Sequence, residues 1–218
     1  MDWHLVSYAD ENFAEQQKFL HQTHKQGFIH HPYTRKQLET TQFYKDNKKI
    51  LDSPTGAGWW IWKPYYILET LKSANTGDYI IYCDCGDMFS PGLPDFVEET
   101  LDEEDLSLLL LGNNINGQYT KRDCFIKMGC DDADYHDSNQ LEAGFMIWRV
   151  REESIKIVEE WLEYCTDIDV INNAPSTLAE ELNTFKEHRN DQSVLTNLAI
   201  RDGLSVGGQD YRNYIECD

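Results

Sequence analysis

A short apolar run in the middle of the chain, Tyr79–Cys83, constrains the fold more than any other stretch. The run contains no charged residue and does not alternate between apolar and polar positions. A strand that faces water on one side alternates, whereas a strand covered on both faces need not. The run therefore predicts the central strand of a mainly parallel sheet with helices on both faces, which is an α/β fold.

Two acidic residues and a glycine end this strand abruptly, at Asp84, Gly86 and Asp87. In open α/β sheets, ligands bind beyond the carboxyl ends of the strands. Carboxylate oxygens suit a hard divalent cation such as Mg²⁺ or Mn²⁺, and a glycine lets the backbone approach a ligand closely. The same residues also fit an acidic turn that only ends a strand, so both interpretations stay open at this point.

The charge of the chain excludes several kinds of partner. It carries 39 acidic and 19 basic residues, a formal net charge of −20. Such a chain is a poor candidate for binding nucleic acid or an anionic membrane, because nothing offsets the repulsion of the phosphates. An anionic ligand would need local positive charge, from a metal ion or from a few basic residues. No apolar run approaches the roughly 20 residues of a membrane span, so we predict no membrane insertion.

The ends of the chain and its cysteines indicate the cellular location and the domain content that we expect. The start is polar and acidic, unlike a secretory signal peptide. The six cysteines lack the paired spacing of a zinc site, so we expect reduced thiols in a soluble, cytoplasmic protein. The 218 residues suffice for one α/β domain, residues 1–218. The end carries no polar tail, from which we expect the amino-terminal part of a longer multidomain protein.

Further strands and helices are expected on both sides of the central run. The strands are residues 5–9, 106–111, 145–148 and 204–206. The helix pattern is clearest over Glu152–Cys165, where apolar residues share one face. Other helices are expected before residue 26 and over residues 35–48, 64–76, 95–101, 120–128 and 191–202.

The first strand ends at an acidic turn, and such a turn is where many α/β proteins hold a nucleotide. Ser7, Tyr8 and Ala9 are therefore candidates for nucleotide contacts. The alternative is an ordinary helix start, capped by Asp10 or Asn12.

A tryptophan-rich stretch, residues 59–62, leads into Lys63 and Pro64. Pro64 fits the first turn of a helix, and most of the tryptophans are expected in the core. Lys63 is a cation placed where a loop enters a helix. It either extends over the tryptophans at the surface or meets an anionic ligand.

Two more polar clusters precede regular elements. Glu142 and the small residues 143–144 lie at the start of an expected strand, where a ligand can approach closely. Residues 188–192 place His188, Asp191 and Gln192 at the start of a helix. A capping role needs only one polar side chain.

Together the candidates provide oxygen ligands and an imidazole for a metal ion, two cations and two further carboxylates. They suit transfer from a nucleoside-diphosphate donor, because a divalent ion with Lys63 or Arg122 can stabilise the charge of the leaving diphosphate. A carboxylate near the acceptor can take its hydroxyl proton. The chain lacks the GxxxxGK[ST] and GxGxxG motifs, which argues against a P-loop or a dinucleotide site.

Four separated stretches also carry a resemblance to a known family. They are residues 58–64 (GWWIWKP), 80–86 (IIYCDCG), 141–145 (LEAGF) and 188–193 (HRNDQS). In this order they resemble a group of GT-A fold glycosyltransferases from bacterial surface-polysaccharide clusters and large viruses. Within the group, the chain looks most like the amino-terminal domain of the capsid-glycosylating transferases of large green-algal viruses. The resemblance covers nearly the whole chain.

The resemblance implies a GT-A domain with a nucleotide-binding half and an acceptor-binding half. It implies a UDP-sugar donor, a UDP-hexose, with Mn²⁺ or Mg²⁺, and a glycan or glycoprotein acceptor, here a viral capsid glycoprotein. A viral protein of this kind would act in the host cytoplasm. By this resemblance, residues 84–86, with Asp84 first and then Cys85 and Gly86, match the DxD metal-and-nucleotide motif. Lys63 matches a lysine near the donor diphosphate.

The resemblance also places Asp191 and Gln192 as an acid–amide pair beside the donor sugar, and His188 near the metal ion or diphosphate. One departure is Gly86, which stands where the motif has its second acid. Either Asp87 takes over metal binding, or Asp84 works with water and the diphosphate alone.

The mechanism stays open at this point. In an inverting reaction Asp191 is the expected base and Glu142 the second choice; in a retaining one Asp191 only orients sugar hydroxyls. The alternative to an enzyme is a GT-A domain that binds a sugar or nucleotide without turnover. A purely interacting acidic domain is a third reading, which the clustered motifs disfavour.

Overall fold

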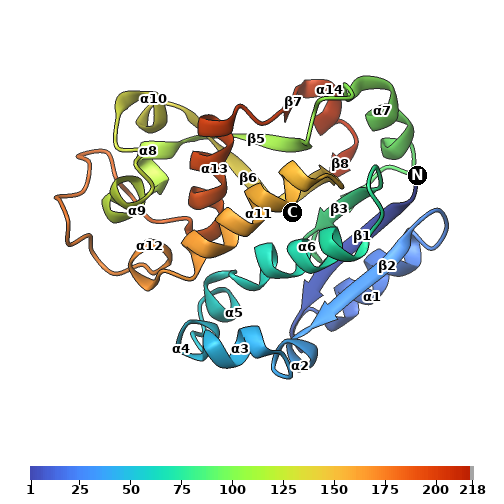
Figure 1. The fold of residues 1–218 in the computed structure, drawn as a ribbon, viewed down its shortest axis with the longest axis horizontal. Coiled ribbons are helices and arrows are strands. Elements are labelled where there is room, and N and C mark those ends of the chain that lie inside the picture. Colours follow the sequence, from blue (N-terminus) through green and yellow to red (C-terminus); the bar gives the residue numbers. More distant parts are fainter. Residues whose placement is uncertain (217–218) are drawn as a thin grey trace.

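A mixed sheet of six strands forms the centre of the computed structural model, which describes residues 1–216 (Figure 1). The strand order is β2-β1-β3-β6-β5-β7. Strand β1 pairs in parallel with β2 and β3, and β5 pairs in parallel with β7, whereas β6 runs antiparallel to both β3 and β5. The strands are β1 Trp3–Ala9, β2 Ile29–Thr34, β3 Tyr79–Cys83, β5 Ser107–Ile115, β6 Asn139–Arg149 and β7 Val206–Gly207.

The predicted central strand is confirmed as β3, which lies inside the sheet with all five residues buried. Its side chains alternate between two hydrophobic clusters, one on each face of the sheet. Ile80 and Tyr82 belong to one cluster, and Tyr79, Ile81 and Cys83 to the other. Burial on both faces explains why the run needs no polar alternation.

Helices cover both faces of the sheet, as Figure 1 shows. On one face, α6 (Trp62–Ser73), α11 (Glu152–Cys165) and α13 (Asn190–Asp202) pack in the larger cluster. On the other face, Leu20 of α1 (Ala14–Thr23) and Val97 of α7 (Leu93–Thr100) pack in the second cluster. The predicted α/β class is thus confirmed as a mixed, mostly parallel sheet flanked by helices in a single domain.

Short elements complete the fold. A second sheet pairs β4 with β8 in antiparallel fashion. Among the described residues, no helix has both the length and the apolarity needed to cross a membrane. The remaining elements are α2 Arg35–Leu38, α3 Gln42–Asp46, α4 Lys48–Leu51, α5 Gly56–Trp59, α8 Asn116–Tyr119, α9 Arg122–Lys127, α10 Ala133–His136, α12 Ile168–Ile171, α14 Gln209–Arg212, β4 Met88–Phe89 and β8 Ile215–Glu216.

Residues 29–48 fold differently from the prediction. The single helix expected over residues 35–48 is instead α2, α3 and the start of α4, because the Thr41 side chain accepts a backbone hydrogen bond and begins a new helix at residue 42. Strand β2 was not predicted, since two histidines and Pro32 interrupt its pattern. It lies at the edge of the sheet, where a proline is tolerated.

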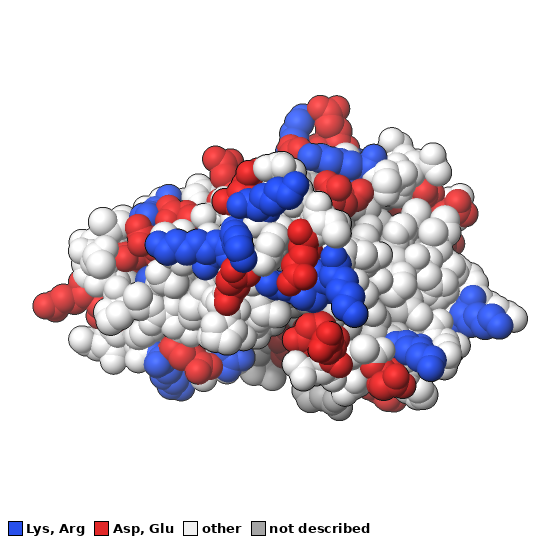
Figure 2. Space-filling view, turned by 90° about the horizontal axis from the view of Figure 1, so that it is seen from below, with Lys and Arg blue, Asp and Glu red and all other residues white. Residues whose placement is uncertain are grey.

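Charged side chains of both signs share one face of the molecule, whereas the described cysteines are buried. Figure 2 shows acidic and basic side chains interspersed on one face of the molecule. Cys217 lies outside the described residues. The cysteines within them are free and buried: Cys83, Cys85, Cys124, Cys130 and Cys165.

Candidate functional site

The antiparallel pairing of β3 with β6 builds the floor of the candidate site. It brings Gly144 beside Asp84, whose backbone N–H donates to the Gly144 carbonyl at 2.8 Å. A Cβ atom on Gly144 would lie 3.2 Å from Asp84 Oδ2 and 2.8 Å from Asp87 Oδ2. The two carboxylates therefore converge over the space that a side chain at this position would fill.

Lys63, in the first turn of α6, is the buried cation of this site and is only 3% exposed. Its Nζ donates to the Ala143 carbonyl at 2.8 Å and lies 3.5 Å from Asp84 Oδ1 and 3.7 Å from Asp191 Oδ2. Burial lowers the pKa of Lys63, but Asp84 and Asp191 outweigh burial and hold the pKa above its usual value. The ammonium thus stays charged between two carboxylates rather than extending over the surface.

Asp191 belongs to the first turn of α13 and is 4% exposed. Its Oδ2 is buried and accepts no hydrogen bond within residues 1–216. Burial raises the pKa of Asp191 to about 7, although the charge of Lys63 opposes this shift. Asp191 therefore exchanges a proton near neutral pH, which an ordinary aspartate does not.

Tyr82 holds Asp84 in place, a role that the sequence analysis did not anticipate. Its hydroxyl donates to Asp84 Oδ1, and its ring lies 5.1 Å from the Lys63 ammonium. Residues two apart in a strand point to the same face. The contact could have been predicted from this spacing, because Tyr82 and Asp84 lie on either side of Cys83, the last residue of the strand.

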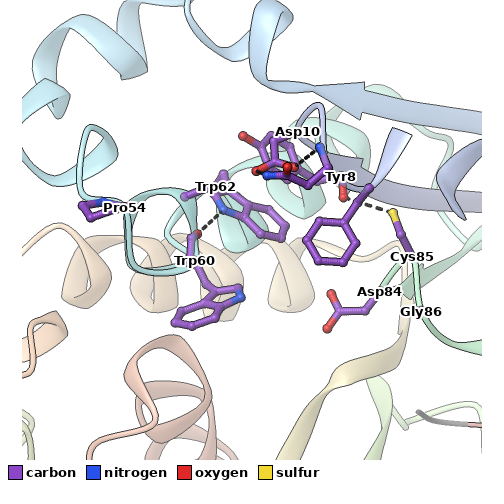
Figure 3. Close-up of a pocket in the computed structure, with 12 residues that line it drawn as sticks. Tyr8, Asp10, Pro54, Trp60, Trp62, Asp84, Cys85 and Gly86 are labelled. Atoms are coloured by element: carbon purple, nitrogen blue, oxygen red, sulfur yellow. Dashed lines mark hydrogen bonds between the residues drawn. The ribbon is translucent and has the colours of Figure 1, made fainter. Parts of the chain in front are cut away.

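An aromatic cavity of about 410 Å³ opens beside Asp84. In Figure 3, Trp60 and Trp62 lie on one side of it, with Asp84 and Cys85 on the other. Tyr8 also lines it and stacks on Trp62, with ring centroids 4.0 Å apart. The volume falls within the range of about 300–1,000 Å³ that is usual for small-molecule sites.

The ends of β1 and β3 are tied together beneath this cavity. The Cys85 thiol donates to the Tyr8 carbonyl at 3.1 Å, and burial raises the pKa of Cys85 to about 12. Gly86 also lines the cavity. Ser7 and Ala9 are buried and line neither this cavity nor the next, and the Ser7 hydroxyl bonds to His21 at 2.8 Å.

A second cavity, polar and of about 400 Å³, adjoins the first. Trp60 and Asp84 line both cavities, and Lys63, Asp191 and Gln192 line the second. The Gln192 side chain accepts from the Ala143 N–H at 3.2 Å and donates to Gln140 at 2.9 Å. It thereby fixes the start of α13 against β6.

The predicted metal role of His188 does not fit its surroundings. Its Nδ1 accepts from the Lys121 N–H at 3.2 Å, and its Nε2 donates to the Val170 carbonyl at 2.8 Å. Burial lowers the pKa of His188 to about 3, which keeps the ring neutral. Both nitrogens are thus engaged with the backbone, and neither remains for a metal ion in this arrangement.

Three further predicted residues, Arg122, Glu142 and Asp87, line neither cavity. Arg122 forms an ion pair with Asp131 at 2.6 Å, and Glu142 accepts from Arg212 at 3.0 Å. Glu142 was expected near the acceptor because it precedes Ala143 and Gly144. Its side chain instead engages α14, and the carboxylates that line the second cavity are those of Asp84, Glu187 and Asp191.

A left-handed turn leads from the first cavity to Lys63. Five successive residues, 56–60, have positive φ, and three of them are not glycine: Ala57, Trp59 and Trp60. Each such residue costs about 1–2 kcal/mol. Gly58 is required there, because a Cβ atom would lie 2.6 Å from the Leu51 Cα. Strain of this kind is typical of functional sites, where the surrounding structure maintains it.

Comparison with known proteins identifies the fold. No protein-family model and no curated protein matches the chain. The galactosyltransferase LgtC, solved with donor and acceptor sugar analogs, is 15% identical, with a TM-score of 0.50 over 94% of this chain and 73% of LgtC. Mouse xyloside xylosyltransferase 1 is 9% identical, with a TM-score of 0.50 over 95% of this chain and 84% of that enzyme. The chain has the GT-A glycosyltransferase fold.

A third solved structure concerns the predicted viral resemblance. It is a glycosyltransferase involved in glycosylation of the major capsid of PBCV-1, 11% identical over 77% of this chain and 68% of that one. Its TM-score of 0.43 is too low to support an argument. The closer resemblance to the viral enzymes therefore stays a prediction from the sequence motifs.

Proposed function

We propose that the protein is a glycosyltransferase that moves a hexose from a UDP-sugar to a hydroxyl group of a glycan or glycoprotein, with Mn²⁺ or Mg²⁺. The observation that carries the proposal is the junction of two cavities at Asp84, beside the buried Lys63 and Asp191. One cavity is aromatic and suits a nucleoside. The other is polar and suits a sugar, whose hydroxyl groups need hydrogen-bond partners.

Lys63 supplies the local positive charge that an acidic protein needs for a diphosphate. Its ammonium is held between Asp84 and Asp191 at the junction of the two cavities. As the bond to the sugar breaks, negative charge develops on the diphosphate. A fixed cation in a buried site stabilises that charge more than water does, because it needs no reorganisation.

Asp84 and Asp87 would hold the divalent ion. Their carboxylates converge over Gly144, which leaves the space open because it has no side chain. Within residues 1–216, no group of three His, Cys, Asp or Glu side chains is arranged to bind a metal ion. Two carboxylates suffice for Mg²⁺ when substrate phosphates and water supply the other ligands. The bound ion would neutralise charge on the diphosphate.

Asp191 is the base in this proposal if the reaction inverts the anomeric centre. Its Oδ2 has no hydrogen-bond partner among the described residues, and the residue lines the second cavity. A pKa of about 7 suits a general base, whose pKa should lie near the working pH. The acceptor proton would pass to Oδ2 as the hydroxyl oxygen attacks. In a retaining reaction, Asp191 orients sugar hydroxyls instead.

Calorimetric titration of UDP with and without Mn²⁺ tests the proposal. We expect tight binding only with Mn²⁺, weakened by Asp84→Ala and unchanged by Asp46→Ala, the same substitution at an exposed position on α3 outside both cavities. Release of UDP from a panel of UDP-sugars, with neutral glycans as acceptors, then tests turnover. Binding without turnover of any donor would make the protein a binding domain, and no binding of UDP would refute the proposal.

A further inference from the structure

Trp60 occupies the junction between the two cavities. It is the one aromatic residue that lines both, and it shares this position with Asp84. Its indole makes no stacking contact with another aromatic ring among residues 1–216, whereas Tyr8 and Trp62 stack on each other. Trp60 is also only partly buried. A large apolar ring is thus left facing the space where a ligand would pass from one cavity to the other.

The left-handed turn of residues 56–60 is built to seat this ring. A Cβ atom at Gly56 would lie 2.2 Å from Cε3 and 2.3 Å from Cδ2 of Trp60, so the indole rests directly on the Gly56 backbone. The Gly56 carbonyl accepts from the indole of Trp62 at 2.9 Å, and the Trp60 carbonyl accepts from the Lys63 N–H at 2.9 Å. The turn therefore fixes the ring relative to both the aromatic cavity and the site cation.

We infer that Trp60 is the platform on which the hexose ring of the donor stacks, which makes it the residue that distinguishes a nucleotide sugar from a bare nucleotide. The inference rests on the proposed function. A pyranose has an apolar face of C–H groups, which buries well against an aromatic ring. Its hydroxyls would meet the polar side of the second cavity, where Asp191 and Gln192 lie.

The position of Trp60 favours the donor sugar over the acceptor. With the nucleoside in the aromatic cavity and the diphosphate beside Asp84 and Lys63, the attached sugar is the first group to enter the second cavity. The donor must therefore cross the junction where Trp60 lies. An acceptor that occupies the second cavity does not have to cross this junction.

The adjacent Trp59 provides a matched control. It has nearly the same backbone conformation, with φ of +54 against +59 for Trp60, and it is also partly buried. Both tryptophans pack against the larger hydrophobic cluster. Trp59 lines neither cavity. A Trp59→Ala variant thus loses similar packing without losing the proposed platform.

The test is calorimetric titration of UDP, UDP-glucose and UDP-galactose with Mn²⁺ and no acceptor. For the UDP-sugar that the wild type binds more tightly, we expect Trp60→Ala to weaken binding about tenfold more than it weakens UDP binding. Trp60→Phe should restore most of this difference, and Trp59→Ala should weaken the two ligands equally or not at all.

A second pair of variants moves the ring without removing it. Gly56→Ala should reproduce the Trp60→Ala pattern, since its Cβ would occupy the place of the indole. Gly129→Ala imposes similar backbone strain, at φ +68 with no atom within 4 Å, and should leave the ratio of the two affinities unchanged.

The outcomes separate the two proposals. Equal weakening of UDP and UDP-sugar by Trp60→Ala, with tight binding by the wild type, overturns the inference and leaves the proposed function intact. A wild type that binds neither UDP nor either UDP-sugar overturns both. A large effect of Trp59→Ala on the ratio would show that packing, not stacking on the sugar, sets the preference.

Discussion

Replacing Asp191 with asparagine should stabilise the fold while it removes turnover. The pKa of Asp191 is raised to about 7 in the folded protein, against 3.8 for an unperturbed aspartate. The folded state therefore holds its proton more tightly than the unfolded state does. Stability from this group is complete below pH 3.8 and is lost as the pH rises towards 7.

The magnitude follows from the difference between the two pKa values. At about 1.4 kcal/mol for each pKa unit, the buried charge costs about 4 kcal/mol above pH 7. The asparagine carries no charge and avoids this cost. Part of the gain is lost because Lys63 then keeps, within residues 1–216, only Asp84 as a charged partner at ion-pair distance. We therefore expect the variant to be more stable by about 1–3 kcal/mol at pH 8.

Urea unfolding at pH 8 and pH 5 measures this prediction. At pH 5 the wild-type carboxylate is largely protonated in the folded state, so the advantage of Asp191→Asn should shrink to about 1 kcal/mol or less. Asp46→Asn, on the exposed face of α3, is the control and should change little at either pH. If Asp191 is the base, turnover of the asparagine variant should fall by roughly 10² or more while UDP still binds.

Two results would refute the stability argument, and a third would refute the role of Asp191 as base. A variant that is less stable than the wild type at pH 8 would mean that the Asp191 charge is well compensated in the folded protein. A gain that is equal at pH 8 and pH 5 would mean that it does not come from the ionisation of Asp191. Unchanged turnover would remove Asp191 from the role of base.

Three further predictions concern the metal ion, the cation and the histidines. Gly144→Ala should reduce the Mn²⁺-dependent gain in UDP affinity about tenfold, because its Cβ would crowd Asp87 at 2.8 Å; Gly92→Ala, where the nearest atom is 3.6 Å away, should not. Lys63→Met should weaken UDP binding by roughly 10² in calorimetry, since it removes the fixed charge for the diphosphate. The pKa of His21 is lowered to about 4 by burial and neighbouring imidazoles, so the unfolded state takes up its proton first. Thermal stability should fall as the pH drops from 6.5 towards 4, and His21→Gln should flatten this slope; an unchanged slope would contradict it.

The sequence alone determined those elements whose burial can be recognised from the local pattern of apolar residues. The run Tyr79–Cys83 and the one-sided helix Glu152–Cys165 form as predicted, because burial on two faces or on one leaves a readable period. Strand β2 escaped prediction because an edge strand with a proline and two histidines has no such period. The strand conformation of β2 comes from its parallel pairing with β1 and not from a pattern in its own sequence.

For the candidate site too, the sequence determined one part and the tertiary structure the other. The sequence predicted candidate residues at chain turns, and the structure brings three of them, Asp84, Lys63 and Asp191, within ion-pair distance. The sequence could not determine that Glu142 pairs with Arg212, or that both His188 nitrogens form hydrogen bonds with backbone groups. Those outcomes depend on the register of β6 and on the packing of distant loops. The sequence specifies which groups are available, and only the tertiary contacts decide which of them remain uncommitted and face a ligand.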